Sequence, residues 1–181
     1  MMGEDDVEDT SPNSFNSKAV WARMSVIAGG PAFNLILAWI FCMILIGVTG
    51  YRPPAVAEVL EGSSAQEQGM QAGDVIKEIN GRNVHIWDDM NLYTLTHADD
   101  APFEIVYERD GKEYTAEVEP RVLDESGSKL LGVVSGEIEK PGILGTMQYG
   151  FYQLEYWVHY TVDCLRMLVT GQAGLQDLSG P

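Results

Sequence analysis

The stretch GSSAQEQGMQAGDVIKEING, residues 62–81, decides the fold that we expect for the middle of this chain. Its first three residues are small and favour a turn, and residues 65–70 fit a short helix. Residues 75–79 contain valine and isoleucine and predict a strand. The Asn80-Gly81 dipeptide predicts a tight type I′ hairpin, because both residues tolerate a positive φ. The chain is therefore expected to reverse direction here and to begin an antiparallel sheet.

The surrounding residues complete an α+β module, which we place at residues 51–140. Alternating apolar residues and turn dipeptides predict its strands. The other expected strands are residues 55–60, a return strand at Val84, residues 103–107, residues 114–118 and residues 130–134. Asp110-Gly111 predicts a second hairpin. Residues 87–96 predict a helix whose acidic first turn suits the positive end of the helix dipole.

Residues 24–50 carry no charged side chain, and Asn34 is the strongly polar residue among them. About 20 apolar residues cross the hydrocarbon core of a bilayer, so we expect a transmembrane helix here, with a buried core helix as the alternative. Lys18 and Arg23 precede this run, and the positive-inside rule places the acidic segment of residues 1–23 in the cytoplasm. The α+β module is then extracytoplasmic. The acidic first residues exclude the positive n-region of a secretory signal.

Residues 141–181 are expected to form an amphipathic helix on the membrane surface and the start of a connector to a further membrane segment. Apolar residues recur at steps of four and three and define one helical face. They are Met147, Phe151, Leu154, Val158, Val162, Leu165 and Leu168. Tyrosine and tryptophan side chains in this stretch are of the kind that settle at a membrane interface. Glu155, His159 and Asp163 share another face, for which we expect contact with solvent rather than metal binding.

The composition bears on the partners of the chain. Its 181 residues include 11 Lys and Arg against 27 Asp and Glu, a net charge of −16. Negative charge of this size repels phosphate backbones, which argues against nucleic acid as a partner. Cys42 and Cys164 show no spacing typical of a disulfide framework or a zinc knuckle.

Residues 62–81 resemble part of a bacterial PDZ domain, a module of several bacterial protease classes. The sequence GPAFN at residues 30–34 narrows the choice, because it is similar to the G-P-x-x-N motif that begins the second membrane helix of site-2 proteases. Residues 2–5 resemble the acidic stretch after that family's G-G-Y element, and residues 168–171 and 178–181 resemble the segment that leads to its next membrane helix. The chain is thus similar to an internal fragment of a bacterial site-2 protease, a regulated intramembrane zinc metalloprotease with a PDZ-like domain.

Two catalytic motifs of that family do not occur in this sequence. One is H-E-x-x-H, in which two histidines one helical turn apart bind zinc and the glutamate is the general base. The other is an L-D-G motif whose aspartate is the third zinc ligand, and we expect it beyond Pro181. The resemblance implies zinc in the parent protein. For this chain alone we expect no catalytic residue, no metal ligand and no peptidase activity.

The resemblance also implies a peptide-binding groove. Leu131-Gly132-Val133 resembles the apolar-Gly-apolar loop of PDZ domains, whose backbone N–H groups receive a peptide carboxylate or strand. This loop comes last in the module because the family's PDZ-like domain is circularly permuted. The helix that carries Trp87 and Met90 is expected to form the other wall. The alternative is a plain edge strand that binds nothing.

The membrane motif consists of Gly30, Pro31 and Asn34. Pro31 fits the first turns of a helix, where its missing N–H does no harm. Asn34 needs a hydrogen-bond partner in hydrocarbon, so we expect it to face a neighbouring helix or the catalytic cavity of the parent, with simple helix packing as the alternative. Beyond Asp88 and Asp99, His85 and His97 have no carboxylate or cysteine at metal-binding spacing, and they are expected to be ordinary surface residues.

The function that we expect is that of a membrane-embedded zinc protease cleaving transmembrane substrates, with this portion supplying a membrane helix and a PDZ-like substrate filter. The expected partners are membrane-protein substrates and their trimmed tails, the remaining membrane helices of the same protease and the lipid bilayer. The expected location is the bacterial plasma membrane. The alternative is a non-catalytic, membrane-tethered PDZ adaptor that binds exposed peptide tails.

Overall fold

The computed structural model describes residues 19–97, 102–122 and 129–171. The chain divides into two compact units, residues 1–41 and residues 42–181. The first unit holds most of helix α1 (Val20–Thr49), and the second holds the strands and the other helices of the described residues. One long helix and a module of mixed strands and helices confirm the predicted α+β class.

Helix α1 is the one helix among the described residues that is long and apolar enough to cross a membrane, with a mean hydropathy of 2.3 in its most apolar part. It begins at Val20, earlier than the predicted residue 24. The extra turn is compatible with a helix because the Ser25 hydroxyl donates a hydrogen bond to the Trp21 carbonyl (2.9 Å). Pro31 therefore lies inside the helix and not in its first turns, which corrects the prediction. Its ring nitrogen removes one main-chain hydrogen bond there.

The central sheet has four strands in the order β3-β2-β4-β5, and each pair is antiparallel. The strands are β2 (Val75–Ile79), β3 (Arg82–Asn83), β4 (Phe103–Arg109) and β5 (Lys112–Val118). Both predicted hairpin turns are confirmed, because Asn80 and Gly81 have φ of 47° and 75° and Asp110 and Gly111 have φ of 52° and 75°. The return strand predicted at Val84 is wrong. The two-residue turn pairs Arg82 directly with Ile79, so the short return strand comes earlier.

Two further strand pairs complete the second unit. They are β1 (Val56–Val59) with β8 (Val133–Ser135) and β6 (Arg121–Val122) with β7 (Lys129–Leu130). The prediction of one strand over residues 130–134 is wrong, because the chain breaks between β7 and β8. Gly132 has a φ of 85°, which is incompatible with a continuous strand.

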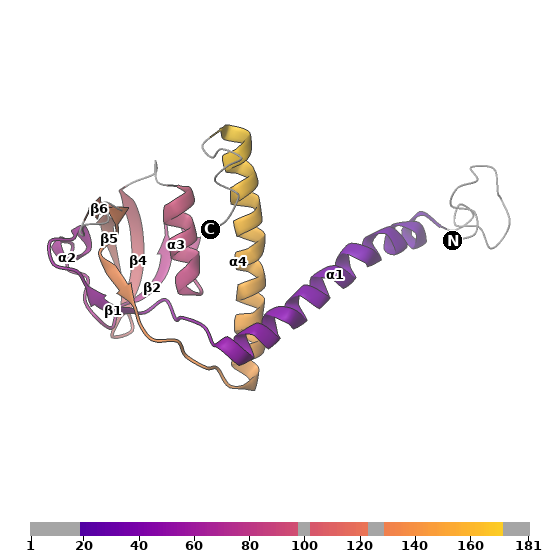
Figure 1. Cartoon of the computed structure of the whole chain (residues 1–181), viewed down its shortest axis with the longest axis horizontal. Helices are drawn as coiled ribbons and strands as arrows, with labels where there is room; N and C mark the ends of the chain where they lie inside the picture. Colours follow the sequence, from indigo (N-terminus) through magenta and orange to yellow (C-terminus); the bar gives the residue numbers. More distant parts are fainter. Residues whose placement is uncertain (1–18, 98–101, 123–128, 172–181) are drawn as a thin grey trace. The chain divides into compact units, whose positions relative to one another are not determined.

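The hydrophobic core lies between the central sheet and α3 (Trp87–Thr96). Phe103 and Ile105 of β4 are fully buried, and Trp87, Met90 and Tyr93 of α3 pack in the same cluster. Figure 1 shows α3 between the sheet and α4 (Ile143–Thr170), in agreement with its contacts to α4. The short helix α2 (Ser64–Glu67) lies near β5.

A buried carboxylate, Asp74, fixes the start of β2. Its side chain is 0% exposed. Arg109 donates two hydrogen bonds to it, from Nε to Oδ1 (2.6 Å) and from Nη2 to Oδ2 (2.7 Å), and the Gln71 N–H donates a third (2.7 Å). Because a buried charge is tolerated only when it is paired and hydrogen-bonded, this cluster joins the end of β4 to the turn before β2.

Helix α4 turns its polar face toward the rest of the second unit. Asp163 is buried, and Arg82 donates a hydrogen bond from Nη1 to its Oδ2 (3.1 Å). The Tyr152 ring stacks on the His85 ring with centroids 4.0 Å apart. The expectations of a solvated polar face and of a free surface His85 are therefore wrong, because the β2–β3 hairpin and the segment before α3 present complementary groups to this face.

His97 at the end of α3 is also held in place. Its ring stacks on Tyr93 with centroids 4.3 Å apart, and its Nε2 lies 3.0 Å from Nη1 of Arg166 in α4. The prediction of an ordinary surface residue is wrong here as well, because α4 provides a partner for this end of α3.

Most side chains of the predicted apolar face of α4 are exposed, while Leu154 and Leu168 are half-buried. The exposed members of this face include Met147, Phe151, Val158, Val162 and Leu165. Helix α4 is thus amphipathic in the opposite sense to a helix of a soluble core, with its polar side packed inward and its apolar side outward.

Candidate functional site

A groove of about 900 Å³ opens between α3 and the segment that leads into β8. Most of the side chains that line it are apolar. The lining residues are Leu60, Trp87, Met90, Asn91, Thr94, Leu95, Glu119, Pro120, Leu130, Leu131, Val133, Val134 and Ser135. A concave, mainly apolar surface with a few polar groups is typical of a ligand site.

Helix α3 forms one wall of the groove. The buried side chains of Trp87 and Met90 anchor it in the core, while Leu95 is 72% exposed. Asp89 fixes the start of the helix, because its Oδ2 accepts hydrogen bonds from the N–H groups of His85 (2.9 Å) and Ile86 (3.1 Å). Burial raises the pKa of the Asp89 carboxyl, and these two backbone bonds act in the opposite direction.

The opposite wall is formed by Leu131-Gly132-Val133. Leu131 and Gly132 are buried, and the Gly132 carbonyl accepts a hydrogen bond from the Leu60 N–H (2.8 Å), which fixes the loop to the end of β1. Strand β8 pairs with β1 along one edge, and among the described residues no strand pairs with its other edge. An unpaired strand edge beside an apolar groove is the arrangement in which an extended peptide can add as a further strand.

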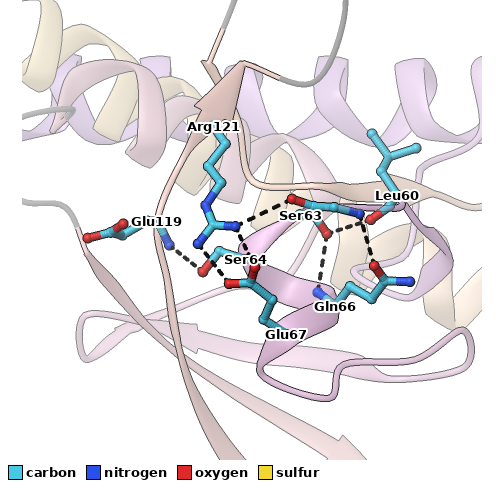
Figure 2. Close-up of polar contacts among 8 residues, drawn as sticks. Leu60, Ser63, Ser64, Gln66, Glu67, Glu119 and Arg121 are labelled. Carbon is cyan, nitrogen blue, oxygen red and sulfur yellow. Dashed lines mark hydrogen bonds and ion pairs between the residues drawn. The ribbon is translucent and has the colours of Figure 1, made fainter.

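The rim of the groove is held by a polar cluster around α2, drawn in Figure 2. The Ser63 hydroxyl donates to the Leu60 carbonyl (2.7 Å), and the Ser64 hydroxyl oxygen accepts from the Glu119 N–H (3.1 Å). Ser63 and Ser64 are both buried. Two lining residues that are far apart in sequence, Leu60 and Glu119, are therefore attached to the same turn of helix.

Arg121 and Glu67 complete this cluster. Arg121 donates from Nη1 and Nη2 to the two carboxylate oxygens of Glu67, at 2.8 and 2.7 Å. The hydrogen bonds from Arg121 hold the pKa of the Glu67 carboxyl below its usual range. The same bonds raise the pKa of Arg121. This bidentate pair joins α2 to β6.

The structure places Trp87, Met90, Leu131 and Val133, all predicted as site residues, around this one groove, with Gly132 in the loop between the last two. Sequence reasoning missed the other lining residues. Asn91 and Thr94 could have been found, because they lie at helical spacing from Trp87. No sequence pattern indicated that Glu119 lines the groove, because its contact with Ser64 joins residues 55 positions apart.

Comparison with known protein families shows to which family the chain belongs. The model of peptidase family M50 matches residues 2–181. The chain belongs to peptidase family M50, the site-2 protease family. This membership confirms the resemblance on which the sequence interpretation rested.

Curated relatives of this M50 chain are named as zinc metalloproteases. A putative zinc metalloprotease of Clostridium acetobutylicum is 31% identical over 183 residues, covering 100% of this chain and 53% of the relative. One of Clostridium perfringens is 34% identical over 182 residues, with the same two coverages. The zinc metalloprotease RasP of Bacillus licheniformis is 32% identical over 171 residues, covering 92% of this chain and 40% of the relative. The M50 chain thus spans about half or less of the length of these relatives.

Two solved structures are also similar to part of the M50 chain. The PDZ domain of an SdrC-like protein from Listeria monocytogenes is 22% identical, with a TM-score of 0.38, over 47% of this chain and 88% of that one. The corresponding domain from Listeria innocua is 23% identical, with a TM-score of 0.40, over 49% of this chain and 99% of that one.

The membrane motif of the M50 chain lies in α1, within the first unit. Gly30, Pro31 and Asn34 are exposed. Gly30, Pro31 and Asn34 take no part in the groove, which belongs to the second unit.

The M50 relatives are named as zinc metalloproteases. In the described part of this chain no group of three or more His, Cys, Asp or Glu side chains is placed to hold a metal ion. Asp163, which shares a helix face with Glu155 and His159, is instead bonded to Arg82. The described residues therefore do not fit a zinc centre, and no chemical step can be derived from them.

Proposed function

We propose that this chain is part of a membrane-embedded zinc metalloprotease that cleaves transmembrane substrates, and that it supplies a membrane helix and a peptide-screening domain. Membership of family M50 supports the protease class. The observation that carries the proposal is the presence, in one chain, of a helix able to span a bilayer and of an apolar groove beside an unpaired strand edge.

The proposed ligand of the groove is an extended peptide, such as the trimmed tail of a membrane-protein substrate. The peptide would add to the free edge of β8 by main-chain hydrogen bonds, and its alternate side chains would enter the apolar space between α3 and Leu131. Trp87, Met90, Leu131, Gly132 and Val133 are the proposed peptide-binding residues. A domain that accepts only extended tails would exclude substrates whose outer domains are still folded.

The proposed location is the bacterial plasma membrane, with α1 across the bilayer and the PDZ-like domain on the extracytoplasmic side. Lys18 and Arg23 before the apolar run support this orientation. The exposed apolar side chains of α4 support contact of that helix with the lipid surface. Gly30, Pro31 and Asn34 are proposed to face the other membrane helices of the same protease.

Zinc belongs in this proposal to the parent protease, because the described residues of this chain offer no donor set. A second function, a non-catalytic membrane-tethered adaptor, is favoured by one observation: H-E-x-x-H is absent from this sequence. Both functions use the same groove in the same way. They differ in whether a bound peptide is delivered to a zinc centre.

The test of the proposal uses backbone N-methylation of a model ligand. A short fluorescein-labelled peptide of alternating valine and serine is titrated with the full chain in neutral detergent, and its anisotropy is measured. An added strand pairs with β8 through the backbone N–H and C=O groups of every second residue. Methylation of the one set of alternate amide nitrogens that faces β8 should therefore weaken binding at least tenfold. Methylation of the other set is the matched control and should change little. Equal effects of the two sets would contradict strand addition.

A further inference from the structure

The described lining of the groove carries a single charged residue, Glu119. The other lining side chains are apolar or neutral, and none of them is lysine or arginine. Glu119 is exposed, so its charge is available at the rim without the cost of burial. The groove therefore has a negative charge at its edge that no lining residue compensates.

The backbone of Glu119 is held in place, and its carboxylate points away from the neighbouring ion pair (Figure 2). Its N–H donates to the hydroxyl oxygen of the buried Ser64 (3.1 Å), and Pro120 follows it. Within the described part of the chain, the Glu119 carboxylate forms no hydrogen bond or ion pair. Figure 2 shows this carboxylate pointing away from the Arg121–Glu67 pair. Because its backbone is fixed and its carboxylate has no hydrogen-bond or ion-pair partner among the described residues, Glu119 is suited to contact a ligand.

Arg121 interacts electrostatically with Glu119, but its guanidinium is already paired with Glu67. Its Nη1 and Nη2 donate to the carboxylate of Glu67 at 2.8 and 2.7 Å, and Nη1 lies 3.4 Å from the Gly62 carbonyl oxygen. The positive charge of Arg121 is thus balanced by Glu67, in a chain whose net charge is −16. The rim keeps its negative potential.

From this arrangement we infer that Glu119 determines specificity, and that it selects extended peptides with apolar side chains and a lysine or arginine at the position that meets the rim. The inference rests on the proposed function of the groove and deepens it. Ser64 holds the Glu119 backbone through its hydroxyl oxygen, and Glu67 pairs with Arg121, the nearby cation. An acidic peptide would be repelled, and a neutral one would bind with intermediate strength.

The expected effects are modest because the contact is exposed to solvent. A single exposed charge pair changes affinity by about two- to fivefold. Charges at the rim of an interface act mainly on the association rate and on its salt dependence. The preference for a basic peptide should therefore appear in the association rate and should fade as ionic strength rises.

The experiment compares three valine-serine peptides that are identical except for lysine, glutamine or glutamate at one serine position, with that position scanned along the peptide. Association rates are measured on the full chain in neutral detergent. At one position we expect lysine to bind about two- to fivefold faster than glutamine, and glutamate to bind slower. Glu119→Gln should remove the difference, and Glu119→Lys should reverse the order. Glu117→Gln is the matched control, because Glu117 is an exposed acid on β5 that does not line the groove.

Each outcome of this experiment is decisive. Failure of all three peptides to bind would overturn the proposed peptide groove and this inference together. Equal rates for the three peptides at every position would overturn the specificity of Glu119 and leave the groove intact. A lysine preference that survives in folded Glu119→Gln, or that is lost equally in Glu117→Gln, would assign the effect to the overall charge and also overturn the inference. Thermal melting of each variant shows that it is folded.

Discussion

Nη1 of Arg82 donates a 3.1 Å hydrogen bond to Oδ2 of Asp163, and this contact joins the β2–β3 hairpin to the middle of α4. The two side chains are 23% and 12% exposed, so water screens the pair only partly. The pair explains why α4 packs with its polar face inward. It also fixes which side of α4 remains apolar and uncovered.

Asp163→Asn is expected to loosen α4 from the domain. Loss of the charge leaves Arg82 without its ionic partner at a site of low exposure, with a cost of about 1–3 kcal/mol. Hydrogen exchange of the α4 amides in the full chain should become faster, and the double charge swap Arg82→Asp with Asp163→Arg should slow it again. Glu155→Gln is the control, because its contact with His85 is longer (3.9 Å) and more exposed. Unchanged exchange in Asp163→Asn would show that the pair does not hold the helix.

Asp74→Asn should be the most destabilising of the charge-removing substitutions in the domain. Arg109 would then lose a carboxylate that is fully buried and accepts two of its N–H groups, which costs about 3 kcal/mol. Urea unfolding of the full chain in detergent measures this loss. Glu108→Gln breaks the exposed pair with Lys77 (3.1 Å) and should cost less than about 1 kcal/mol. Similar losses in the two variants would contradict this account of Asp74.

Gly132 should tolerate asparagine better than valine. Its φ of 85° is left-handed backbone, which costs a β-branched residue about 1–2 kcal/mol and asparagine less. The melting temperatures of Gly132→Asn and Gly132→Val give the ranking. Peptide binding is then measured only on the variant that folds. Equal melting temperatures would mean that the loop relaxes around the substitution.

The Glu67–Arg121 pair should make the thermal stability of the chain depend on pH. The pKa of Glu67 is lower in the folded chain than in the unfolded one, so its contribution is complete above the ordinary value of about 4.3 and is lost as the pH falls through the folded pKa. The melting temperature of the wild-type chain should therefore fall more between neutral and strongly acidic solution than that of Glu67→Gln. A parallel fall in both would exclude a contribution from this carboxylate.

The exposed apolar face of α4 should contact lipid. With Cys42 and Cys164 replaced by serine, a spin label placed at Leu165 or at Gln148 reports on two different sides of the helix in nanodiscs, because the two positions lie about 100° apart around its axis. The label at Leu165 should meet oxygen dissolved in the bilayer, and the label at Gln148 should meet a water-soluble nickel chelate, because the two residues belong to the apolar and the polar positions of the helix. Equal access of the nickel chelate to both sites would place α4 in water.

Several elements could be predicted from the sequence because local chemistry determines them. The apolar run of α1 exceeds the thickness of a bilayer, and the Asn80-Gly81 and Asp110-Gly111 dipeptides impose positive φ on their turns. The motif at residues 30–34 and the order of the motifs along the chain were enough to indicate the family. The apolar run, the two turns and the motif at residues 30–34 each depend only on residues that are neighbours in sequence.

The tertiary structure decided what depends on residues far apart in the chain. The break at Gly132 follows from pairing of β8 with β1, and the burial of Asp163 follows from Arg82, 81 positions earlier. The position of the charged Glu119 at the rim of the groove depends on the hydrogen bond from its N–H to Ser64. A helical pattern shows that α4 has two faces, but it does not show which face is buried. That choice depends on the groups that the folded domain presents to the helix.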